Sequence, residues 1–379
     1  MSVEVRMDDL LGRAPIEIDS APVRRALAGQ VVLVTGAAGS IGGELCRQMR
    51  MHHPAGLIGV DRSETGIFYL RSKLERSELA AGDACPADYL VADIGDAERM
   101  RAIFREHRPD VVFHAAAYKH VPLMEHNAGE AVRNNVFSLL ALLDVAEESA
   151  CRGFVLISSD KAVNPASVMG ATKRLGEMIL AARERGSLRC VSVRFGNVLG
   201  SSGSVVPILK GQLRSGHPLT ITHPEVRRFL MTPREAVAMV LLSYTLGSHG
   251  EILALDMGEP VLILELARKL IRMHGLGATE VRIEFTGLRA GEKMSEEICS
   301  AGEELLPTAH PKIKRIRRAS VGWKVLAGQL EQLRASLAPG DDAEIRARLR
   351  EIVPEYGNGR SEHPARLLDE AIRTTSPAT

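Results

Sequence analysis

The chain has 379 residues, of which 45% are hydrophobic and 25% are charged, and this composition indicates a globular protein with a substantial core. Its formal net charge of +1 gives no electrostatic reason to expect binding to nucleic acid or to an anionic membrane, and its five widely spaced cysteines argue against a disulfide framework and a zinc site. Because no apolar run approaches the roughly 20 residues of a membrane span and no signal-peptide core is present, the sequence predicts a cytoplasmic protein with reduced thiols.

Residues 1–29 are interpreted as a leader or linker packed on the surface. From 30 to 197, short apolar runs alternate with helical segments, which is typical of a doubly wound parallel α/β sheet of the Rossmann type, the fold of an NAD(P)-binding domain. Its strands are predicted at 30–35, 56–61, 88–94, 110–116, 153–158 and 188–195. Its helices are predicted after a glycine turn at 36–42, and at 64–80, 96–107, 127–149 and 167–186.

Beyond residue 197 the alternation becomes less regular, and residues 198–302 are predicted to form a smaller α+β region that binds the substrate. Such a region would lie over the C-terminal ends of the parallel strands, where ligands bind in these folds. Its helices are predicted at 204–214, 233–246 and 261–274, and its strands at 219–222, 226–232, 251–256 and 281–285. Residues 303–379 are predicted to be a helical extension, with helices at 322–337 and 341–353 and a polar tail.

Glycines at 36, 39 and 42 follow the first predicted strand and open a helix. In a dinucleotide-binding turn, Gly36 makes the tight turn, Gly39 lets the backbone approach a pyrophosphate, and Gly42 lets helix and strand pack closely. Asp61, which ends the second strand, would accept both hydroxyls of an adenosine ribose and favours NAD, although Arg62 beside it keeps NADP possible. The alternative is that Asp61 only caps a turn. Further cofactor contacts are predicted at Ser40, Ile41, Asp93, Ile94, Ala115 and Ala116, whereas Asn135 is predicted to join strand to helix.

Several segments in matching order resemble one family: TGAAGSIG, YKHVPLME, SSDKAVNPASVMGATK, RFGNVLGSSGSVVP, LTITHPEVRRFLMT and GLRAGEK. Together they resemble the UDP-N-acetylglucosamine 4,6-dehydratases of bacterial polysaccharide and protein-glycosylation pathways, which are extended short-chain dehydrogenases. The resemblance covers roughly residues 30–310. The segment at 9–19 also resembles the linker before this domain in long, membrane-anchored members, so the chain resembles a long-type catalytic domain without its membrane half.

The resemblance implies a redox-neutral dehydration in which NAD takes a hydride from sugar C4 and returns it to C6. The transient ketone at C4 acidifies the C5 proton, which a base removes as an acid protonates the departing C6 hydroxyl. Short-chain dehydrogenases usually carry a proton-transferring tyrosine four residues before a lysine. Here that position is Met169, as in long family members, while Lys173 is retained to hold the nicotinamide ribose.

The proton transfer is therefore assigned to residues that follow the fifth predicted strand and match the family's acid/base pair. Asp160 is expected to protonate the C6 oxygen, Lys161 to take the C5 proton with a lowered pKa, and Ser159 to hydrogen-bond the C4 oxygen. The alternatives are that Asp160 caps a helix, that Lys161 is a solvent-facing loop residue, and that Met169 fills the core.

The nucleotide sugar is expected to contact cations and amides that match the family. These are Lys119 and His120 at the sugar, Asn197, Arg228 and Arg289 at the nucleotide, and Glu292 at the uridine ribose. Surface salt bridging is the better interpretation for Arg227, and a structural role is the alternative for His120. The histidine spacing predicts no metal.

Three rivals to the dehydratase are considered. A 4-epimerase needs no C5 base, a 5,6-dehydratase uses nearly the same site, and a catalytically silent NAD-binding sensor would have lost its tyrosine. The methionine-bearing members resemble retaining enzymes, which favours a D-xylo product. A homo-oligomer is expected from family habit, with the C-terminal helices packing on their own domain or on a neighbour.

Overall fold

The computed structural model describes residues 7–357, apart from 12, 15, 82–84, 184–185, 278–279 and 339. The first six residues of the predicted leader, the polar tail beyond 357 and the predicted helical residues 184–185 lie outside the described residues.

One long sheet runs through the described part of the chain. In chain order its strands are β1 (Val31–Thr35), β2 (Gly56–Asp61), β3 (Ala87–Val91), β4 (Val111–His114), β5 (Gly153–Ile157), β6 (Arg189–Arg194), β11 (Glu251–Leu255), β14 (Glu304–Pro307) and β15 (Ile313–Arg317). In space they are ordered β14-β15-β11-β6-β5-β4-β1-β2-β3, and all neighbours from β3 to β11 are parallel. The strand order reverses between β1 and β4, so the predicted doubly wound α/β fold is confirmed and its switch point lies there.

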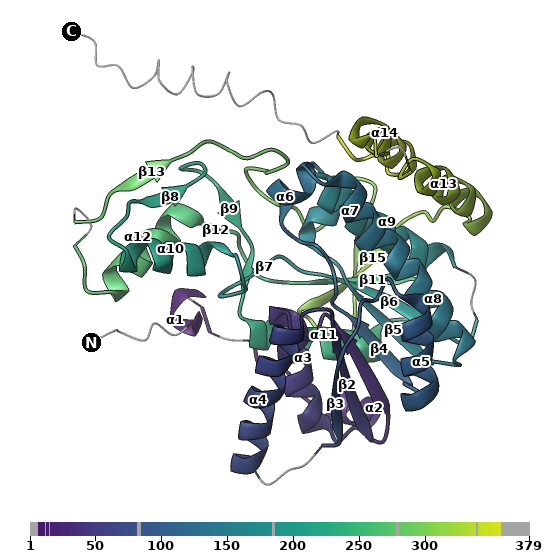
Figure 1. The fold of residues 1–379 in the computed structure, drawn as a ribbon. Helices are drawn as coiled ribbons and strands as arrows, with labels where there is room; N and C mark the ends of the chain where they lie inside the picture. The colour runs from purple at the N-terminus through teal and green to yellow at the C-terminus, as the bar shows by residue number, and fades with distance from the viewer. Residues whose placement is uncertain are drawn as a thin grey trace.

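Helices cover both faces of the sheet (Figure 1). One face carries α5 (Ala97–His107), α7 (Ala128–Val132), α8 (Ser138–Glu148) and α9 (Val168–Ala182), and the other carries α2 (Ala21–Leu27), α3 (Ser40–Met49), α4 (Glu64–Ala81) and α11 (Pro233–Leu246). Each face has its own buried cluster, with Phe154 in the first and Phe113 in the second. Because apolar helices lie on both sides, the residues of β4 and β5 are buried without alternation.

The predicted helix at 127–149 is α7 and α8 joined by a π-helical turn at Arg133–Phe137. This turn carries Asn135, whose Oδ1 accepts from the backbone N of Tyr118 at 2.8 Å and whose Nδ2 donates to Thr172 Oγ1 at 3.0 Å. The predicted structural role of Asn135 is confirmed, because its side chain ties the loop after β4 to α9.

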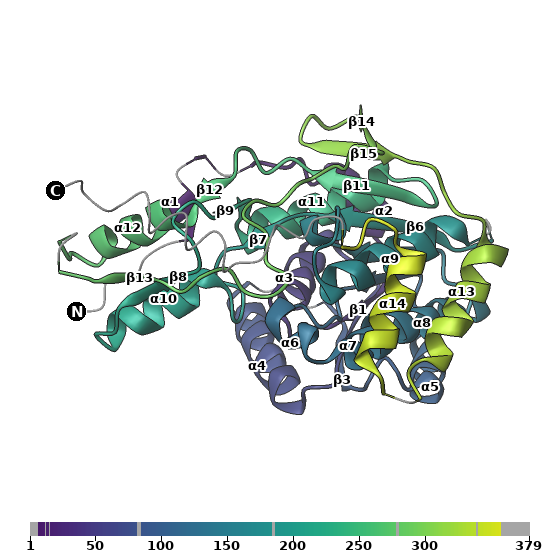
Figure 2. The same ribbon diagram turned by 90° about the horizontal axis from the view of Figure 1, so that it is seen from above.

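A smaller lobe with its own core lies beside the sheet (Figures 1 and 2). It contains α10 (Val205–Arg214), α12 (Ile263–Met273) and three two-stranded pairs: β7 (Asn197–Val198) with β10 (Leu230–Met231), β9 (Arg227–Arg228) with β12 (Val261–Leu262), and β8 (Leu219–Ile221) with β13 (Ile283–Phe285). The predicted strand at 226–232 is therefore two short strands, because its two ends pair with different partners. The chain also forms α6 (Val121–Glu125) and 3-10 turns at Arg50–His52 and Asp160–Ala162.

Two expectations about the ends of the chain are corrected. The leader is not confined to the surface: α1 (Met7–Leu11) buries Leu10 in the core of the smaller lobe, and α2 buries Leu27 beneath the sheet. The region after 303 does not begin with a helix, because β15 pairs with β11 and β14 extends the sheet further, both in antiparallel fashion. β14 is the edge strand, and its Glu304 and Pro307 are residue types that discourage further pairing at an exposed edge.

The C-terminal helices α13 (Trp323–Ala335) and α14 (Asp342–Ile352) pack on their own chain, where Leu330 and Leu349 join the buried cluster on the α9 face (Figure 2). In the described part of the chain, no helix combines the length and the apolar character that a membrane crossing needs. The division at 29, 197 and 302 stays a prediction.

Candidate active site

A continuous cleft lies at the C-terminal ends of the parallel strands, between the sheet and the smaller lobe. It consists of adjoining hollows of about 160, 620 and 230 Å³. The first two share Gly36 and Tyr118 in their walls, and the last two share Lys119, Lys161 and Asn197. An extended ligand can therefore occupy all of them.

The glycine turn is a place where only glycine fits. Gly36 has a φ of +68°, and a Cβ added there would lie 2.6 Å from the backbone N of Ala116. A Cβ on Gly42 would lie 2.0 Å from the carbonyl oxygen of Gly36. Ser40 Oγ accepts from the backbone N of Ser202 at 3.0 Å, which ties the turn to the loop across the cleft. The wall of the central hollow contains Gly36, Gly39, Ser40, Ile41 and Gly42.

The smallest hollow lies at the ends of β1, β2, β3 and β4. Asp61 lines it, while its Oδ2 accepts from Ala38 N at 3.1 Å and its Oδ1 from Ser63 N at 2.9 Å. The turn-capping alternative is therefore present, and each oxygen keeps a second lone pair for a ligand. The Arg62 guanidinium stacks 4.6 Å from the centre of the Tyr118 ring. The hollow is also lined by Asp93, Ile94, Ala115 and Ala116.

Met169 and Lys173 lie one turn apart on α9, and both line the central hollow. Met169 is buried and has no proton to transfer. Lys173 Nζ donates to the carbonyl oxygen of Ile157 at 2.9 Å. Burial lowers the pKa of Lys173 to about 8, although the Glu177 carboxylate acts in the opposite direction.

Ser159, Asp160 and Lys161 form a compact group directly after β5. Asp160 Oδ1 accepts from Ser159 Oγ at 2.8 Å and from Lys161 Nζ at 3.0 Å. Ser159 and Lys161 line the cleft, whereas the Asp160 carboxylate is 1% exposed and its Oδ2 has no hydrogen-bond partner among the described residues. Asp160 therefore does not line the cleft itself. It is connected to the cleft by its hydrogen bonds with Ser159 and Lys161, which do line it.

The expected lowered pKa of Lys161 is not found in this structure. Burial acts to lower the pKa, but the carboxylates of Asp160 and Glu296 outweigh it and raise the pKa above its ordinary value. Lys161 is therefore held as a cation, with Nζ 3.4 Å from Glu296 Oε1 and 2.9 Å from Asn197 Oδ1. The sequence reasoning missed Glu296, although it lies only three residues beyond the GLRAGEK segment.

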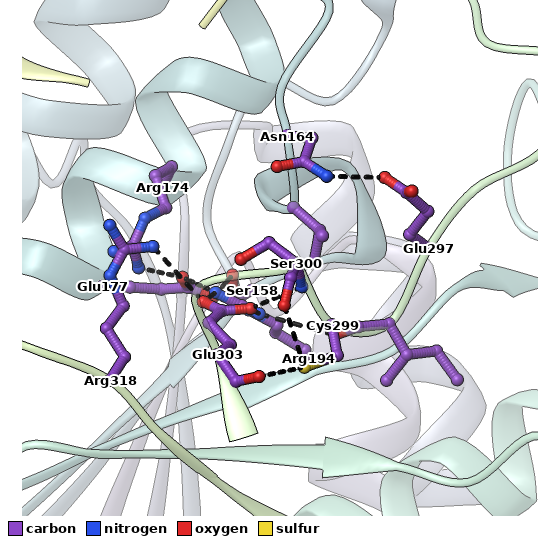
Figure 3. Close-up of polar contacts among 12 residues, drawn as sticks. Ser158, Asn164, Arg174, Glu177, Arg194, Glu297, Cys299, Ser300, Glu303 and Arg318 are labelled. Carbon is purple, nitrogen blue, oxygen red and sulfur yellow. Dashed lines mark hydrogen bonds and ion pairs between the residues drawn. The ribbon is translucent and has the colours of Figure 1, made fainter. Parts of the chain in front are cut away.

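A buried cluster of charged side chains lies behind this group (Figure 3). Ser158 Oγ donates to Glu177 Oε1 at 2.7 Å, and Glu177 is held by both Arg194 at 2.7 Å and Arg174 at 3.0 Å. Arg194 also forms two hydrogen bonds of 2.8 Å with Glu303, which precedes β14. The cluster therefore fixes the end of β5, where the Ser159–Lys161 group begins, to the C-terminal part of the chain.

The third hollow faces the smaller lobe and is rich in cations. Arg228 is buried, and its Nη2 lies 2.7 Å from Glu292 Oε1, while Arg289 is exposed at the rim. Lys119 and His120 line the boundary with the central hollow, and burial lowers the pKa of both. All the residues predicted to contact substrate thus lie along one part of the cleft.

The remaining expectations concern a surface arginine and metal binding. Arg227 is exposed, but the expected surface salt bridge of its side chain is not found among the described residues. Within the residues described, no group of three or more histidine, cysteine, aspartate or glutamate side chains is arranged to hold a metal ion.

Residues 32–318 match the family described as "Polysaccharide biosynthesis protein". The chain is 43% identical over 347 residues to the probable polysaccharide biosynthesis protein EpsC of Bacillus subtilis. The matched region covers 91% of this chain and 57% of EpsC. The chain therefore spans little more than half of that relative's length.

Two other relatives carry different activities in their names. The UDP-N-acetylglucosamine 4,6-dehydratase (inverting) of Campylobacter jejuni is 31% identical over 281 residues, covering 73% of this chain and 79% of that protein. The UDP-glucose 4-epimerase of Rickettsia conorii is 33% identical over 280 residues, covering 72% of this chain and 79% of that protein. Among solved structures, Pen from Bacillus thuringiensis superposes with a TM-score of 0.69 at 28% identity, covering 78% of this chain and 93% of that one.

Proposed function

The chain belongs to the polysaccharide biosynthesis protein family, and from that membership and the cleft geometry we propose that it catalyses the NAD-dependent, redox-neutral 4,6-dehydration of a UDP-N-acetylhexosamine. The proposed reaction converts UDP-N-acetylglucosamine to its UDP-4-keto-6-deoxy derivative, for a surface polysaccharide or a glycoprotein sugar. The observation that carries the proposal is the group of Ser159, Asp160 and Lys161, which puts proton-transferring side chains where Met169 offers none.

The glycine turn and the smallest hollow fit a dinucleotide. Because Gly36 has no side chain, the backbone of the turn packs closely against the backbone of Ala116. The backbone N–H groups at the N-terminus of α3 would then be available to a pyrophosphate. Asp61 would hold the adenosine ribose and Lys173 the nicotinamide ribose. When bound, NAD supplies hydride acceptance from sugar C4 and hydride return to C6.

The proton chemistry is proposed to begin at the C4 hydroxyl. In this scheme Ser159 Oγ accepts that proton and passes its own to Asp160, and the hydrogen bond of 2.8 Å between the two side chains supports this step. The ketone at C4 then acidifies the C5 proton, which Lys161 takes, and Asp160 returns its proton through Ser159 to the departing C6 oxygen. The proton lost from the C4 hydroxyl thus leaves in the water molecule, and Lys161 gives a proton back to C5 as hydride reaches C6, so protons and electrons balance.

The charged state of Lys161 fits this order of events. In the resting site two carboxylates hold its proton, so the amine cannot act as a base at the outset. Once Asp160 is protonated by the oxidation step, one of those negative charges disappears and the pKa of Lys161 falls. Removal of the C5 proton is therefore coupled to the oxidation that makes that proton acidic.

The cations of the third hollow are proposed to bind the UDP diphosphate. Arg289 is exposed at the rim and free to move to a phosphate, whereas Arg228 is already oriented by Glu292. Lys119 and His120, at the boundary with the central hollow, would face the hexose.

A nucleotide-sugar 4-epimerase is the second candidate, because the Rickettsia relative is as similar to the chain as the Campylobacter dehydratase. An epimerase oxidises C4 but has no need for a base at C5. The buried pairing of Asp160 with Lys161 supports dehydration over this alternative.

The test is incubation of the protein and NAD with UDP-N-acetylglucosamine in heavy water, followed by mass spectrometry and NMR of the product. We expect a 4-keto-6-deoxy sugar carrying deuterium at C5. A C4-inverted sugar without deuterium would establish the epimerase, and a 5,6-ene would establish a 5,6-dehydratase. If the protein bound NAD but turned over no nucleotide sugar, the result would support a catalytically silent NAD-binding sensor.

A further inference from the structure

Glu296 is a buried carboxylate beside the proton-transferring group. It is 6% exposed, and it lines the hollow that faces the smaller lobe. Its Oε1 lies 3.4 Å from Lys161 Nζ, and its Oε2 is buried without a hydrogen-bond partner among the described residues. A buried carboxylate oxygen without a donor is costly, so a site that keeps one has a reason to do so.

The segment that carries Glu296 is fixed to the segment that carries Lys161. Lys293 Nζ donates to the carbonyl oxygen of Val163 at 2.9 Å, and Asn164 Nδ2 donates to Glu297 Oε2 at 2.9 Å (Figure 3). Farther along, Glu303 is clamped by Arg194. These anchors lie on both sides of Glu296, so the contact between Glu296 and Lys161 is built into the fold.

The surroundings of Lys161 leave Glu296 as its remaining partner once Asp160 is neutral. The groups that face its ammonium are the carboxylates of Asp160 and Glu296, the Arg228 guanidinium and the Asn197 amide. The other titratable side chains on the shared walls are Lys119, His120, Lys173, Arg289 and Glu292. Of the described groups that face Lys161, only the carboxylates of Asp160 and Glu296 can accept a proton, and Asp160 already carries one after the oxidation proposed above.

We propose that Glu296 accepts the proton of Lys161, so that the neutral amine can take the C5 proton of the sugar. This inference rests on the proposed dehydration. In the step, an N–H bond of the ammonium breaks and an O–H bond on Glu296 forms. The amine then receives the C5 proton, and the resulting ammonium, whose other hydrogens come from solvent, gives a proton to C5 as hydride reaches C6, after which the proton on Glu296 returns to the amine. No further reactant is needed.

Glu296 is a positioning residue in this scheme, because it acts through Lys161. An internal acceptor makes the release of the lysine proton independent of the solvent. Turnover of the wild-type protein is therefore expected to vary little around neutral pH. Without Glu296 the solvent must remove that proton, and turnover must then rise with pH.

The test compares Glu296→Gln with Glu265→Gln, a control on α12 that removes an exposed carboxylate whose ion pair is with Arg268. We expect Glu296→Gln to lose turnover on the order of a hundredfold near neutral pH. Its rate should then rise by up to about tenfold per pH unit, whereas Glu265→Gln should follow the wild type. A uniform loss at every pH, or an unchanged profile, would overturn the proposal. Glu296→Asp keeps the charge and should recover part of the pH-independent rate.

A second readout needs no substrate. Lys161 is labelled with an acylating reagent over a range of pH and quantified by peptide mass spectrometry. Because Glu296→Gln removes a neighbouring negative charge, the labelling curve should move to lower pH by about one unit. If the curve moves and no nucleotide sugar is turned over by the wild type, the proposed function fails while the coupling of Glu296 to Lys161 stands. If the wild type makes the 4-keto sugar and the curve does not move, the inference about Glu296 is wrong.

Discussion

Lys161 Nζ lies 3.0 Å from Asp160 Oδ1, directly beyond the end of β5, and Lys161 lines the same central hollow as the glycine turn. Ser159 donates to the same carboxylate oxygen, so three consecutive residues form one hydrogen-bonded group. In the proposed mechanism the proton path runs from the end of this strand, so a helix position that usually holds a tyrosine can hold methionine without loss of acid/base function.

Replacing Lys161 with alanine should separate oxidation from elimination. The C4 oxidation uses Ser159 and Asp160, so reduced nicotinamide should still form on the protein, whereas removal of the C5 proton loses its base. We expect turnover to fall by about 10²–10⁴-fold, with C5 deuterium exchange lost. Turnover measured by mass spectrometry and reduced cofactor measured by absorbance check this, and near-normal turnover would show that Lys161 is not the base.

Met169→Leu should leave the reaction nearly intact. Met169 is 2% exposed and has no proton to donate, so a substitution that conserves volume should cost less than about 1.5 kcal/mol of stability. We expect turnover within a few-fold of wild type in steady-state assays. A loss comparable to that of Lys161→Ala would mean that the thioether has a chemical role that the proposed mechanism lacks.

Binding of NAD should depend on the charge of Lys173. Because burial lowers its pKa to about 8, the ammonium is present below that pH and is lost as the pH rises through it. The affinity for NAD, measured by calorimetric titration at several pH values, should therefore weaken on the alkaline side. Lys173→Met should bind NAD weakly at every pH. If the NAD affinity of this variant depended on pH as strongly as that of the wild type, Lys173 would not be the group that sets the pH dependence.

Glu303→Gln should destabilise the fold at neutral pH by roughly 3–5 kcal/mol, because it leaves the buried Arg194 guanidinium partly unpaired. Although burial acts to raise it, Arg194 holds the pKa of Glu303 down to about 2 from an ordinary 4.5. The carboxylate therefore stabilises the fold above about pH 4.5, and this contribution is lost as the pH falls towards 2.

The stability difference between wild type and Glu303→Gln should accordingly shrink in acid. Urea unfolding followed through the single tryptophan, Trp323, measures it. Glu304→Gln is the matched control, since its carboxylate is about half exposed and pairs only with Arg317, and it should cost less than about 1 kcal/mol. Equal effects of the two substitutions would contradict the importance of the buried cluster.

The elements that follow from local patterns were predictable from the sequence. The glycine turn at Gly36 and the apolar runs of the parallel strands predicted the doubly wound sheet, and the strand ends predicted which residues line the cleft. The hairpin of β14 and β15 was not predictable in this way, because its pairing partner, β11, lies about 60 residues earlier in the chain.

The charge state of Lys161 and the burial of Asp160 were also not predictable from the sequence. A lowered pKa for Lys161 follows from burial alone, but the carboxylate of Asp160 and that of Glu296, which only the tertiary fold brings within 3.4 Å, together raise the pKa. The buried position of Asp160 likewise depends on how Ser159 and Lys161 turn towards the cleft. The contact of Lys161 with Glu296 joins distant segments of the chain, and no local spacing encodes it.

The central claim is that one hydride leaves C4 and returns to C6 of the same sugar. UDP-N-acetylglucosamine deuterated at C4 tests it directly, with the position of the label in the product read by NMR. The account predicts a 4-keto-6-deoxy sugar in which the deuterium has moved to C6. A label that remains at C4 of a sugar that keeps its C6 hydroxyl would contradict it.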